Sequence, residues 1–202
     1  MNFRFEEKLK LNKNKLFEFD QWLINNNIFE IYKPREIFSI YYDTKDYKCY
    51  HDSNEGLVPR SKLRLRTYNF KNTKFNKFNI EIKKSLNYGR MKSSQKLEDI
   101  QKATKYGIYF KKYGICYPKI IVKYKRLYYK FDDIRITLDK NIEFKEYFRS
   151  INNKNFNNSC KLVVAEIKYS NRDKLPDLIK KLPFEKIRFS KYCIGLEILN
   201  LV

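Results

Sequence analysis

The segment from Arg60 to Tyr68 alternates strictly between polar and mainly apolar side chains. With the two-residue period of a β-strand, it places four cations on one face and Leu63, Leu65 and Thr67 on the other. The cations are Arg60, Lys62, Arg64 and Arg66. Like charges side by side on a strand repel each other, so this row needs an anionic partner. The segment therefore predicts a strand that lines an anion-binding surface.

Alternation of the same kind recurs along the chain and predicts the other strands. We expect them at residues 2–11, 36–43, 77–85, 90–95, 119–129, 134–139 and 161–170. Helical spacing of apolar residues predicts helices at 14–26, 96–113, 143–151 and 174–182, and polar composition predicts loops at 44–59 and 152–159. About eight mostly antiparallel strands with three or four outer helices give one α+β domain over residues 1–202.

The charge balance indicates a polyanionic partner. Lys and Arg number 44 against 23 Asp and Glu, a net charge of +21, while 43% of the residues are hydrophobic. This is too apolar for a disordered basic tail and too basic for an ordinary enzyme of the cytosol. Nucleic acid, an anionic membrane surface and a polyphosphate-type substrate all fit.

Several kinds of site are excluded by composition. His51 is the only histidine, which disfavours Ser-His-Asp and Cys-His sites and leaves a multi-histidine metal site without ligands. The five glycines make no phosphate-cradling loop, so any bound phosphates must be held by cationic side chains. Four widely spaced cysteines predict reduced, mostly buried thiols. A charged N-terminal segment and the lack of a long apolar run predict a soluble, cytoplasmic protein without a membrane span.

A short pattern, Glu-x-Lys, occurs in three of the predicted strands. It is formed by Glu6 and Lys8, by Glu81 and Lys83, and by Glu166 and Lys168. For one strand, a solvated sheet face is the commoner explanation. Because the same ordered pair recurs in distant strands, a closed eight-stranded barrel with a polar lumen is the alternative that we favour.

At these residues the chain resembles the polyphosphate polymerase (VTC) domain of the triphosphate tunnel metalloenzyme (CYTH-like) superfamily. Eight motifs carry the resemblance, in chain order: Arg4-x-Glu6-x-Lys8, Ile40-Tyr-Tyr-Asp43, Arg60-x-Lys-x-Arg-x-Arg-x-Tyr68, Glu81-x-Lys83, Tyr124-x-Arg126, Arg135-x-Thr-x-Asp139, Glu166-x-Lys168 and Phe189-Ser-Lys-Tyr192.

The resemblance implies a closed antiparallel tunnel whose side chains hold a phosphate chain and a divalent metal ion. Those implied to contact phosphates are Lys8, Arg64, Arg66, Lys83, Arg126 and Lys191. A supporting role is implied for Arg4, Arg60, Tyr124, Arg135, Lys168 and Ser190. Glu166 is the leading ligand for Mn²⁺ or Mg²⁺, with Glu6 and Glu81 as further candidates.

The function expected from this resemblance is transfer of the γ-phosphate of ATP to a growing inorganic polyphosphate chain. Phosphoryl transfer depends on positioning and charge neutralisation, so a site without histidine suffices. A tripolyphosphatase or nucleoside triphosphatase is the second enzyme hypothesis. A noncatalytic polyanion- or RNA-binding module is the third, although carboxylates among the cations disfavour specific nucleic-acid binding.

The sequence also departs from its relatives. The hydrolytic and cyclase branch of the superfamily begins with Glu-x-Glu-x-Lys, whereas Arg4 stands at the first position here. A carboxylate is replaced by a cation, which favours long polyphosphate over a two-metal triphosphatase. The sensory and membrane segments of fungal relatives find no match among the eight motifs, and we expect regulation to come from a membrane-bound partner protein.

Overall fold

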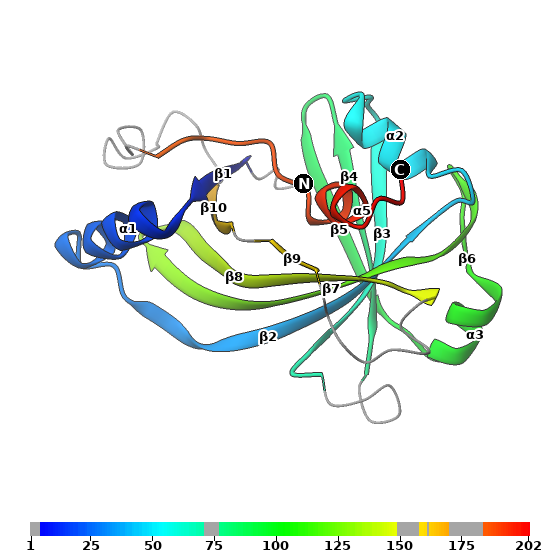
Figure 1. The fold of residues 1–202 in the computed structure, drawn as a ribbon, viewed down its shortest axis with the longest axis horizontal. Coiled ribbons are helices and arrows are strands. Elements are labelled where there is room, and N and C mark those ends of the chain that lie inside the picture. Colours follow the sequence, from blue (N-terminus) through cyan, green and yellow to red (C-terminus); the bar gives the residue numbers. More distant parts are fainter. Residues whose placement is uncertain (1–4, 71–76, 149–157, 161, 170–183) are drawn as a thin grey trace. The chain divides into compact units, whose positions relative to one another are not determined.

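The computed structural model describes residues 5–70, 77–148, 158–160, 162–169 and 184–202 (Figure 1). Its strands are β1 (Phe5–Leu11), β2 (Glu30–Asp43), β3 (Arg60–Tyr68), β4 (Asn79–Leu86), β5 (Gly89–Lys96), β6 (Ile108–Phe110), β7 (Gly114–Phe131), β8 (Ile134–Glu146), β9 (Asn158–Cys160) and β10 (Val163–Tyr169). Its helices are α1 (Lys13–Asn25), α2 (Lys48–Asn54), α3 (Ile100–Tyr106) and α5 (Lys191–Ile198). The α+β class predicted from the sequence is confirmed.

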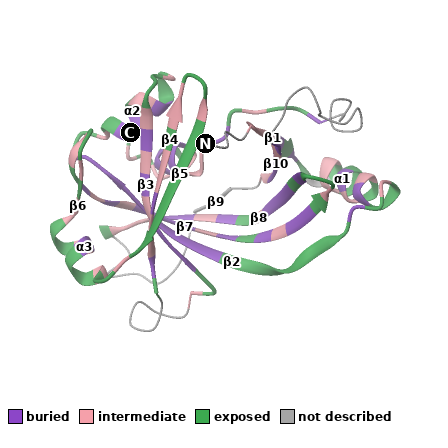
Figure 2. Ribbon diagram, turned by 180° about the vertical axis from the view of Figure 1, so that it is seen from behind, coloured by how far each residue is buried: buried purple, intermediate pink, exposed green. Residues whose placement is uncertain are grey.

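The strands form one ten-stranded sheet in the order β1-β10-β8-β7-β2-β3-β4-β5, with β6 paired to β7 and β9 to β8. The predicted closed eight-stranded barrel is wrong for the described residues, because β1 and β5 end this order and are not paired with each other. The physical reason is visible along β5, where every residue but the first is exposed (Figure 2). Exposed lysines are typical of a sheet edge that stays unpaired.

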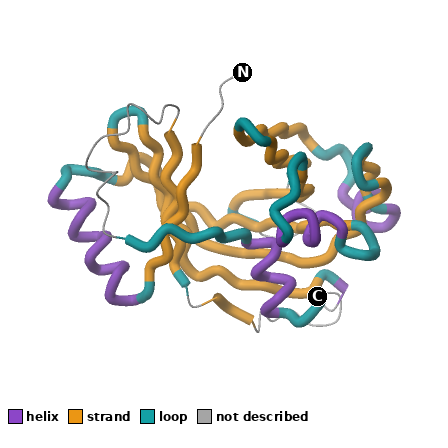
Figure 3. The backbone as a smooth tube through the Cα atoms, turned by 90° about the horizontal axis from the view of Figure 1, so that it is seen from above, coloured by secondary structure: helices purple, strands orange, loops and turns teal. Residues whose placement is uncertain are grey.

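Contacts between residues divide the chain into two compact units. Unit 1 comprises residues 1–35, 124–142 and 160–189, and unit 2 comprises residues 36–123, 143–159 and 190–202. Boundaries between the units fall inside strands, since β2, β7 and β8 each contribute residues to both units. Figure 3 draws the strands in orange and the helices in purple. The two units are described separately below, and the expected single domain stays a prediction.

Unit 1 buries one face of its strands under α1. Leu9 and Leu11 of β1, Ile136 and Leu138 of β8, and Ala165 and Ile167 of β10 form this core with Phe19 and Leu23 of α1. All of these strand positions have the same parity within their strand, so the other face is left for polar side chains. Asn12 caps α1 by accepting a hydrogen bond from the backbone N–H of Lys15.

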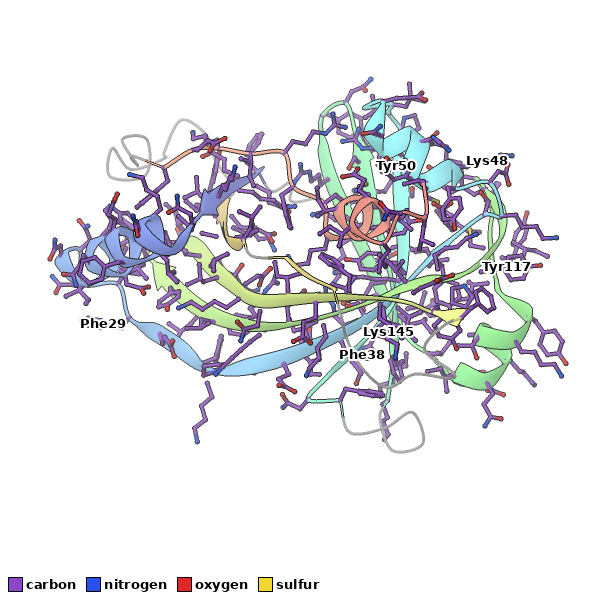
Figure 4. All side chains as sticks on the ribbon, viewed as in Figure 1. Phe29, Phe38, Lys48, Tyr50, Tyr117 and Lys145 are labelled. Carbon is purple, nitrogen blue, oxygen red and sulfur yellow. The ribbon has the colours of Figure 1, made fainter. Side chains whose placement is uncertain are left out.

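Unit 2 also buries one face of its strands. Phe38, Ile40 and Tyr42 of β2 pack with Leu63 and Leu65 of β3, and Phe38, labelled in Figure 4, stacks on Phe70 with ring centroids 4.0 Å apart. Helix α5 packs so closely that a Cβ atom at Gly195 would lie 2.6 Å from Phe144. The residues between these apolar positions therefore share the opposite face.

Three predicted elements are wrong. In each of these segments the local sequence has only a weak preference for helix, strand or loop, so tertiary contacts determine the secondary structure. The predicted loop at 44–59 contains α2, whose first N–H groups are bound by buried Asp43. The predicted helix at 96–113 is the short α3, which is followed from Ile108 by strand β6. The predicted helix at 143–151 begins as strand, because β8 continues to Glu146.

Other predictions fall on residues that are not all described. The helix expected at 174–182 and most of the loop expected at 152–159 lie outside the described residues. Cys49, Cys116 and Cys193 are free and buried, as expected for reduced thiols. Among the described helices, none combines the length and the apolar character that crossing a membrane requires.

Candidate anion-binding site

In unit 1, two Glu-x-Lys strands pair with each other. The antiparallel register sets Glu6 of β1 opposite Lys168 of β10, and Lys8 opposite Glu166. Residues directly opposite each other point to the same face, so the four charges alternate in sign. Along the strands the spacing is also close, with Lys168 Nζ 2.7 Å from Glu166 and Lys8 Nζ 3.3 Å from Glu6. Each charge therefore has opposite charges beside it.

A buried ion pair continues this face on the next strands. Arg126 of β7 donates two hydrogen bonds to Asp139 of β8, at 2.6 and 2.7 Å, and its guanidinium lies 3.5 Å from Glu166. Asp139 is completely buried. Burial alone would lower the pKa of Arg126, but the charge of Asp139 outweighs it, and the pKa rises well above the ordinary value. Arg126 remains charged, and its ring contact with Tyr124 (5.4 Å) fixes it further.

Unit 2 has a face of different composition. The register places the residues of β3 opposite those of β4, and these opposite those of β5. Together these three strands carry eight cations and one carboxylate, Glu81, on this face. The cations are Arg60, Lys62, Arg64, Arg66, Lys83, Arg90, Lys92 and Lys96. The face therefore keeps a large positive excess.

Three lysines stand in one row across this face. Lys62 of β3 is opposite Lys83 of β4, which is opposite Lys92 of β5. Cβ atoms of directly opposed residues lie only about 5 Å apart, and like charges there are destabilising. Such a row is expected where an anion binds.

Glu81, the one carboxylate of this face, forms ion pairs with three of its cations. Its Oε2 lies 2.6 Å from Arg64 and 3.5 Å from Arg66, and its Oε1 lies 2.7 Å from Lys92. Burial would raise the pKa of Glu81, but the charges of Arg64 and Arg66 outweigh it and lower the pKa to about 2. Glu81 is therefore ionised at neutral pH and orients the two guanidinium groups.

Tyr41 of β2 lies among these cations. Arg64 donates a hydrogen bond of 2.9 Å to its hydroxyl oxygen, and Arg64 also lies over its ring at 5.7 Å. Burial would raise the pKa of Tyr41, but the charges of Arg64, Arg66 and Lys191 together lower it. A buried phenol whose pKa is lowered reports a strongly positive potential at this point of the face.

Asp43 organises the elements that surround this face. Its carboxylate is completely buried and accepts hydrogen bonds from the backbone N–H groups of Thr44, Cys49 and Tyr50 at 2.7 to 3.0 Å. It also accepts one from the Tyr192 hydroxyl at 2.5 Å. One carboxylate thus holds the first turn of α2 and the first turn of α5.

The start of α5 is tied to the cationic face. Ser190 caps the helix by accepting a hydrogen bond from the N–H of Cys193, and Lys62 donates a 2.7 Å hydrogen bond to the same hydroxyl oxygen. Tyr192 stacks on Tyr41 with ring centroids 5.4 Å apart. Tyr50 of α2, labelled in Figure 4, donates a hydrogen bond to Glu197 of α5 at 3.3 Å. The helix start is therefore fixed beside the cations.

With this geometry in view, the comparisons decide the family. The model of the VTC domain family matches residues 3–200, nearly the whole chain. The chain belongs to the VTC domain family. The resemblance predicted from eight sequence motifs is thereby confirmed.

Solved structures share the fold of this VTC domain. A candidate adenylate cyclase from Vibrio parahaemolyticus is 14% identical, with 98% of both chains covered and a TM-score of 0.56. A conserved hypothetical protein from Pyrococcus furiosus is 16% identical, with 98% and 90% covered and a TM-score of 0.50. A chain of the Schizosaccharomyces pombe Mediator head module is 12% identical, with 88% of both covered and a TM-score of 0.50. No curated protein sequence matched.

The residues predicted for the site divide between the two units of the VTC domain. Unit 1 holds Glu6, Lys8, Tyr124, Arg126, Arg135, Glu166 and Lys168, which lie on one face. Unit 2 holds Arg60, Arg64, Arg66, Glu81, Lys83, Ser190 and Lys191. Arg4 lies outside the described residues. Arg60 donates to the carbonyl oxygens of Gly56 and Leu57, which anchors a loop.

Sequence reasoning missed four residues of this site. Tyr41 and Asp43 lie in a quoted motif, and Tyr192 in another, yet no role was assigned because the hydrogen bonds between these motifs depend on the fold. Lys92 could have been found, since Arg90 and Lys92 alternate within the predicted strand at 90–95. Its place beside Glu81 depends on the register of β4 and β5.

The predicted metal ligands do not form a preassembled metal site. No group of three or more His, Cys, Asp or Glu side chains is arranged to hold a metal ion in the part of the chain that the structure describes. Glu6, Glu81 and Glu166 each lie beside at least one cation instead. The expected use of Mn²⁺ or Mg²⁺ by these carboxylates stays a prediction.

Proposed function

We propose that this VTC domain is a polyphosphate polymerase that transfers the γ-phosphate of ATP to the end of a growing inorganic polyphosphate chain. The observation that carries the proposal is the cationic face of unit 2, where eight cations accompany one carboxylate across β3, β4 and β5. One triphosphate cannot neutralise so many cations. A long phosphate chain can, because each added phosphate brings another negative charge.

The proposed reaction requires no protein nucleophile. A terminal oxygen of the polyphosphate chain attacks the γ-phosphorus of ATP, a new P–O bond forms, the bond to the bridging oxygen breaks, and ADP leaves. The transferred group carries its charge on oxygens, so fixed cations that neutralise these oxygens lower the barrier. The only histidine is not needed for this chemistry.

Arg64 and Arg66 are the cations that we assign to the phosphate chain first. Both are oriented by Glu81, and Arg66 is also held by a 3.3 Å hydrogen bond to Ser39. Such fixed, partly desolvated guanidinium groups form bidentate hydrogen bonds with phosphate oxygens. Lys83 and Lys191 act as further point charges, while Arg60 is assigned to the loop that it anchors.

In unit 1, Lys8, Lys168 and Arg126 are assigned to phosphate contacts, with Tyr124 holding the Arg126 guanidinium. Because Glu6, Glu166 and Asp139 already neutralise these cations, the phosphates must displace carboxylates to reach them. A divalent ion would then enter with the nucleotide rather than wait in the protein. Glu166 is the carboxylate that we expect to meet it.

One experiment tests the proposal against its rivals. Purified protein is incubated with ATP and Mn²⁺, and the products are run on a polyphosphate gel beside an assay for inorganic phosphate. A ladder supports the polymerase. Free phosphate without a ladder identifies a triphosphatase, and polyanion binding without turnover identifies a binding module.

The Glu166→Gln variant tests the metal assignment in the same assay. It removes the charge of Glu166 while keeping its shape, so the Mn²⁺ concentration needed for half-maximal ladder formation should rise. A variant that makes polyphosphate at the parent rate, with an unchanged Mn²⁺ requirement, refutes the role of Glu166.

A further inference from the structure

Four side chains of unit 1 form an aromatic and cationic cluster that no phosphate assignment uses as a whole. Arg35 lies over the rings of Tyr32 and Tyr128, at 5.6 Å from each centroid. Arg135 lies over Tyr128 at 5.3 Å. The two rings meet edge to face with centroids 5.9 Å apart. These four side chains contact one another, and we call them the Tyr32 cluster. They are Tyr32, Arg35, Tyr128 and Arg135.

The Tyr32 cluster lies at one end of the charged face of unit 1. Arg135 of β8 is opposite Lys168 of β10, which is opposite Glu6 of β1. Thr137, the next residue on the same face of β8, is opposite Glu166. One such step along a strand is about 6.6 Å. The cluster is thus one step beyond the row that contains Glu166 and Lys8.

Exposure divides the cluster into a support and a binding surface. Tyr128 is 4% exposed, so its ring is a fixed base for the two guanidinium groups. Tyr32 is 55% exposed, and both arginines are exposed as well. The planar groups thus have faces directed to solvent, and like charges gathered over one ring leave a positive potential there.

A flat, electron-rich ring attached to an anion matches this combination. Nucleobases stack on tyrosine rings and on arginine guanidinium planes, and the phosphates that they carry suit adjacent cations. Two arginines can also donate to the ring acceptors of a purine. A purely structural role, in which Arg35 fastens β2 to the ring of Tyr128, would explain one arginine over that ring. It would not require the second arginine, Arg135.

We propose that the Tyr32 cluster binds the purine base of the nucleoside triphosphate, with Tyr32 and Arg35 stacking on the base and Arg135 beside it. This inference rests on the proposed function, since it names the subsite for the nucleoside part of the same substrate. Such a subsite would distinguish the donor nucleotide, which has a base, from the polyphosphate product, which has none.

The test compares ligands that share a triphosphate and differ in the base. Binding of ATP, GTP and methyl triphosphate is measured by calorimetry in EDTA, for the parent protein and for Tyr32→Ala and Arg35→Lys. Arg35→Lys keeps the charge and removes the stacking plane. Loss of one stacked base is expected to weaken ATP and GTP binding about tenfold in both variants, while methyl triphosphate binding stays within twofold.

Tyr109→Ala is the matched control, because Tyr109 is a tyrosine of unit 2 that is 73% exposed. It should leave all three affinities unchanged. If Tyr32→Ala weakens all three ligands equally, or none, the inference is overturned while the proposed function stands. If the parent protein binds none of the three ligands, either in EDTA or with added Mn²⁺, the proposed function fails together with the inference.

Discussion

The same Glu-x-Lys motif has different partners in the two units, and the difference separates a face with balanced charges from a face with a large excess of cations. In unit 1 the motif of β1 pairs with the motif of β10, so Glu6 meets Lys168 and Lys8 meets Glu166. In unit 2 the motif of β4 pairs with strands rich in cations, so Lys83 meets two other lysines. The motif itself does not fix the local charge. Its partner strand does.

This difference predicts that removing a cation mainly affects stability in unit 1 and mainly affects anion binding in unit 2. In unit 1 each cation compensates buried or half-buried carboxylates, so its removal should mainly reduce stability. In unit 2 the cations outnumber the carboxylate, and Lys83 is opposite two other lysines, so removal of Lys83 should mainly reduce binding of anions. The following variants test this contrast.

The largest effect on stability is expected for Arg126→Met. Asp139, completely buried, would lose both hydrogen bonds and keep an uncompensated charge. The free energy of unfolding should fall by about 3–5 kcal/mol. Urea denaturation measures it. The double variant Arg126→Met/Asp139→Leu should recover most of the loss, and a loss below about 1 kcal/mol would show that the pair is not a structural element of unit 1.

Glu81 gives unit 2 a dependence of stability on pH. Its pKa is lowered from 4.5 to about 2 in the folded protein, so its contribution is full above pH 4.5 and disappears as pH falls towards 2. The expected loss over this window is roughly 3 kcal/mol. Urea titrations at several pH values should show it in the parent protein and not in Glu81→Gln. Glu98→Gln, at an exposed position, is the control, and parallel pH curves for parent and Glu81→Gln would contradict the assignment.

Lys83→Ala should weaken binding of tripolyphosphate about ten- to a hundredfold, because it removes one charge-assisted contact. Stability should change by less than about 0.5 kcal/mol, because two lysines flank Lys83. Lys84→Ala is a close control, since Lys84 is the next residue and points to the opposite face of the same strand. Equal binding losses in both variants would show a general charge effect and no site.

The smallest effect is expected for Tyr192→Phe, which removes a single donor to buried Asp43. The unfolding free energy should fall by about 1–2 kcal/mol, the cost of one buried hydrogen bond to a charged group. Since Tyr192 is in the first turn of α5, tripolyphosphate affinity should fall less than in Lys83→Ala. Calorimetry and urea denaturation on the same sample give both numbers, and an unchanged stability would remove Asp43 from its organising role.

Much of each strand and of the site could be predicted from local pattern. Alternation identified Arg60–Tyr68 at its full length, as well as the strands that hold Glu81 and Glu166, because a half-buried strand must repeat every two residues. Short elements were harder. Helix α2 was missed since its seven residues have little apolar pattern, and it forms where Asp43 binds its first N–H groups.

The amino-acid sequence by itself determined which face of each strand is charged, the excess of cations, and membership of the VTC domain family. These depend on residue order alone, because side-chain direction in a strand follows from parity. Only the tertiary structure decided which charges meet. Strand register places the Glu-x-Lys motif of β1 opposite that of β10, so that their charges balance, and it sets three lysines in one row. The packing of α5 brings Tyr192 to Asp43, 149 positions away in the sequence. Electrostatic energy depends on distance in space, which residue order does not contain.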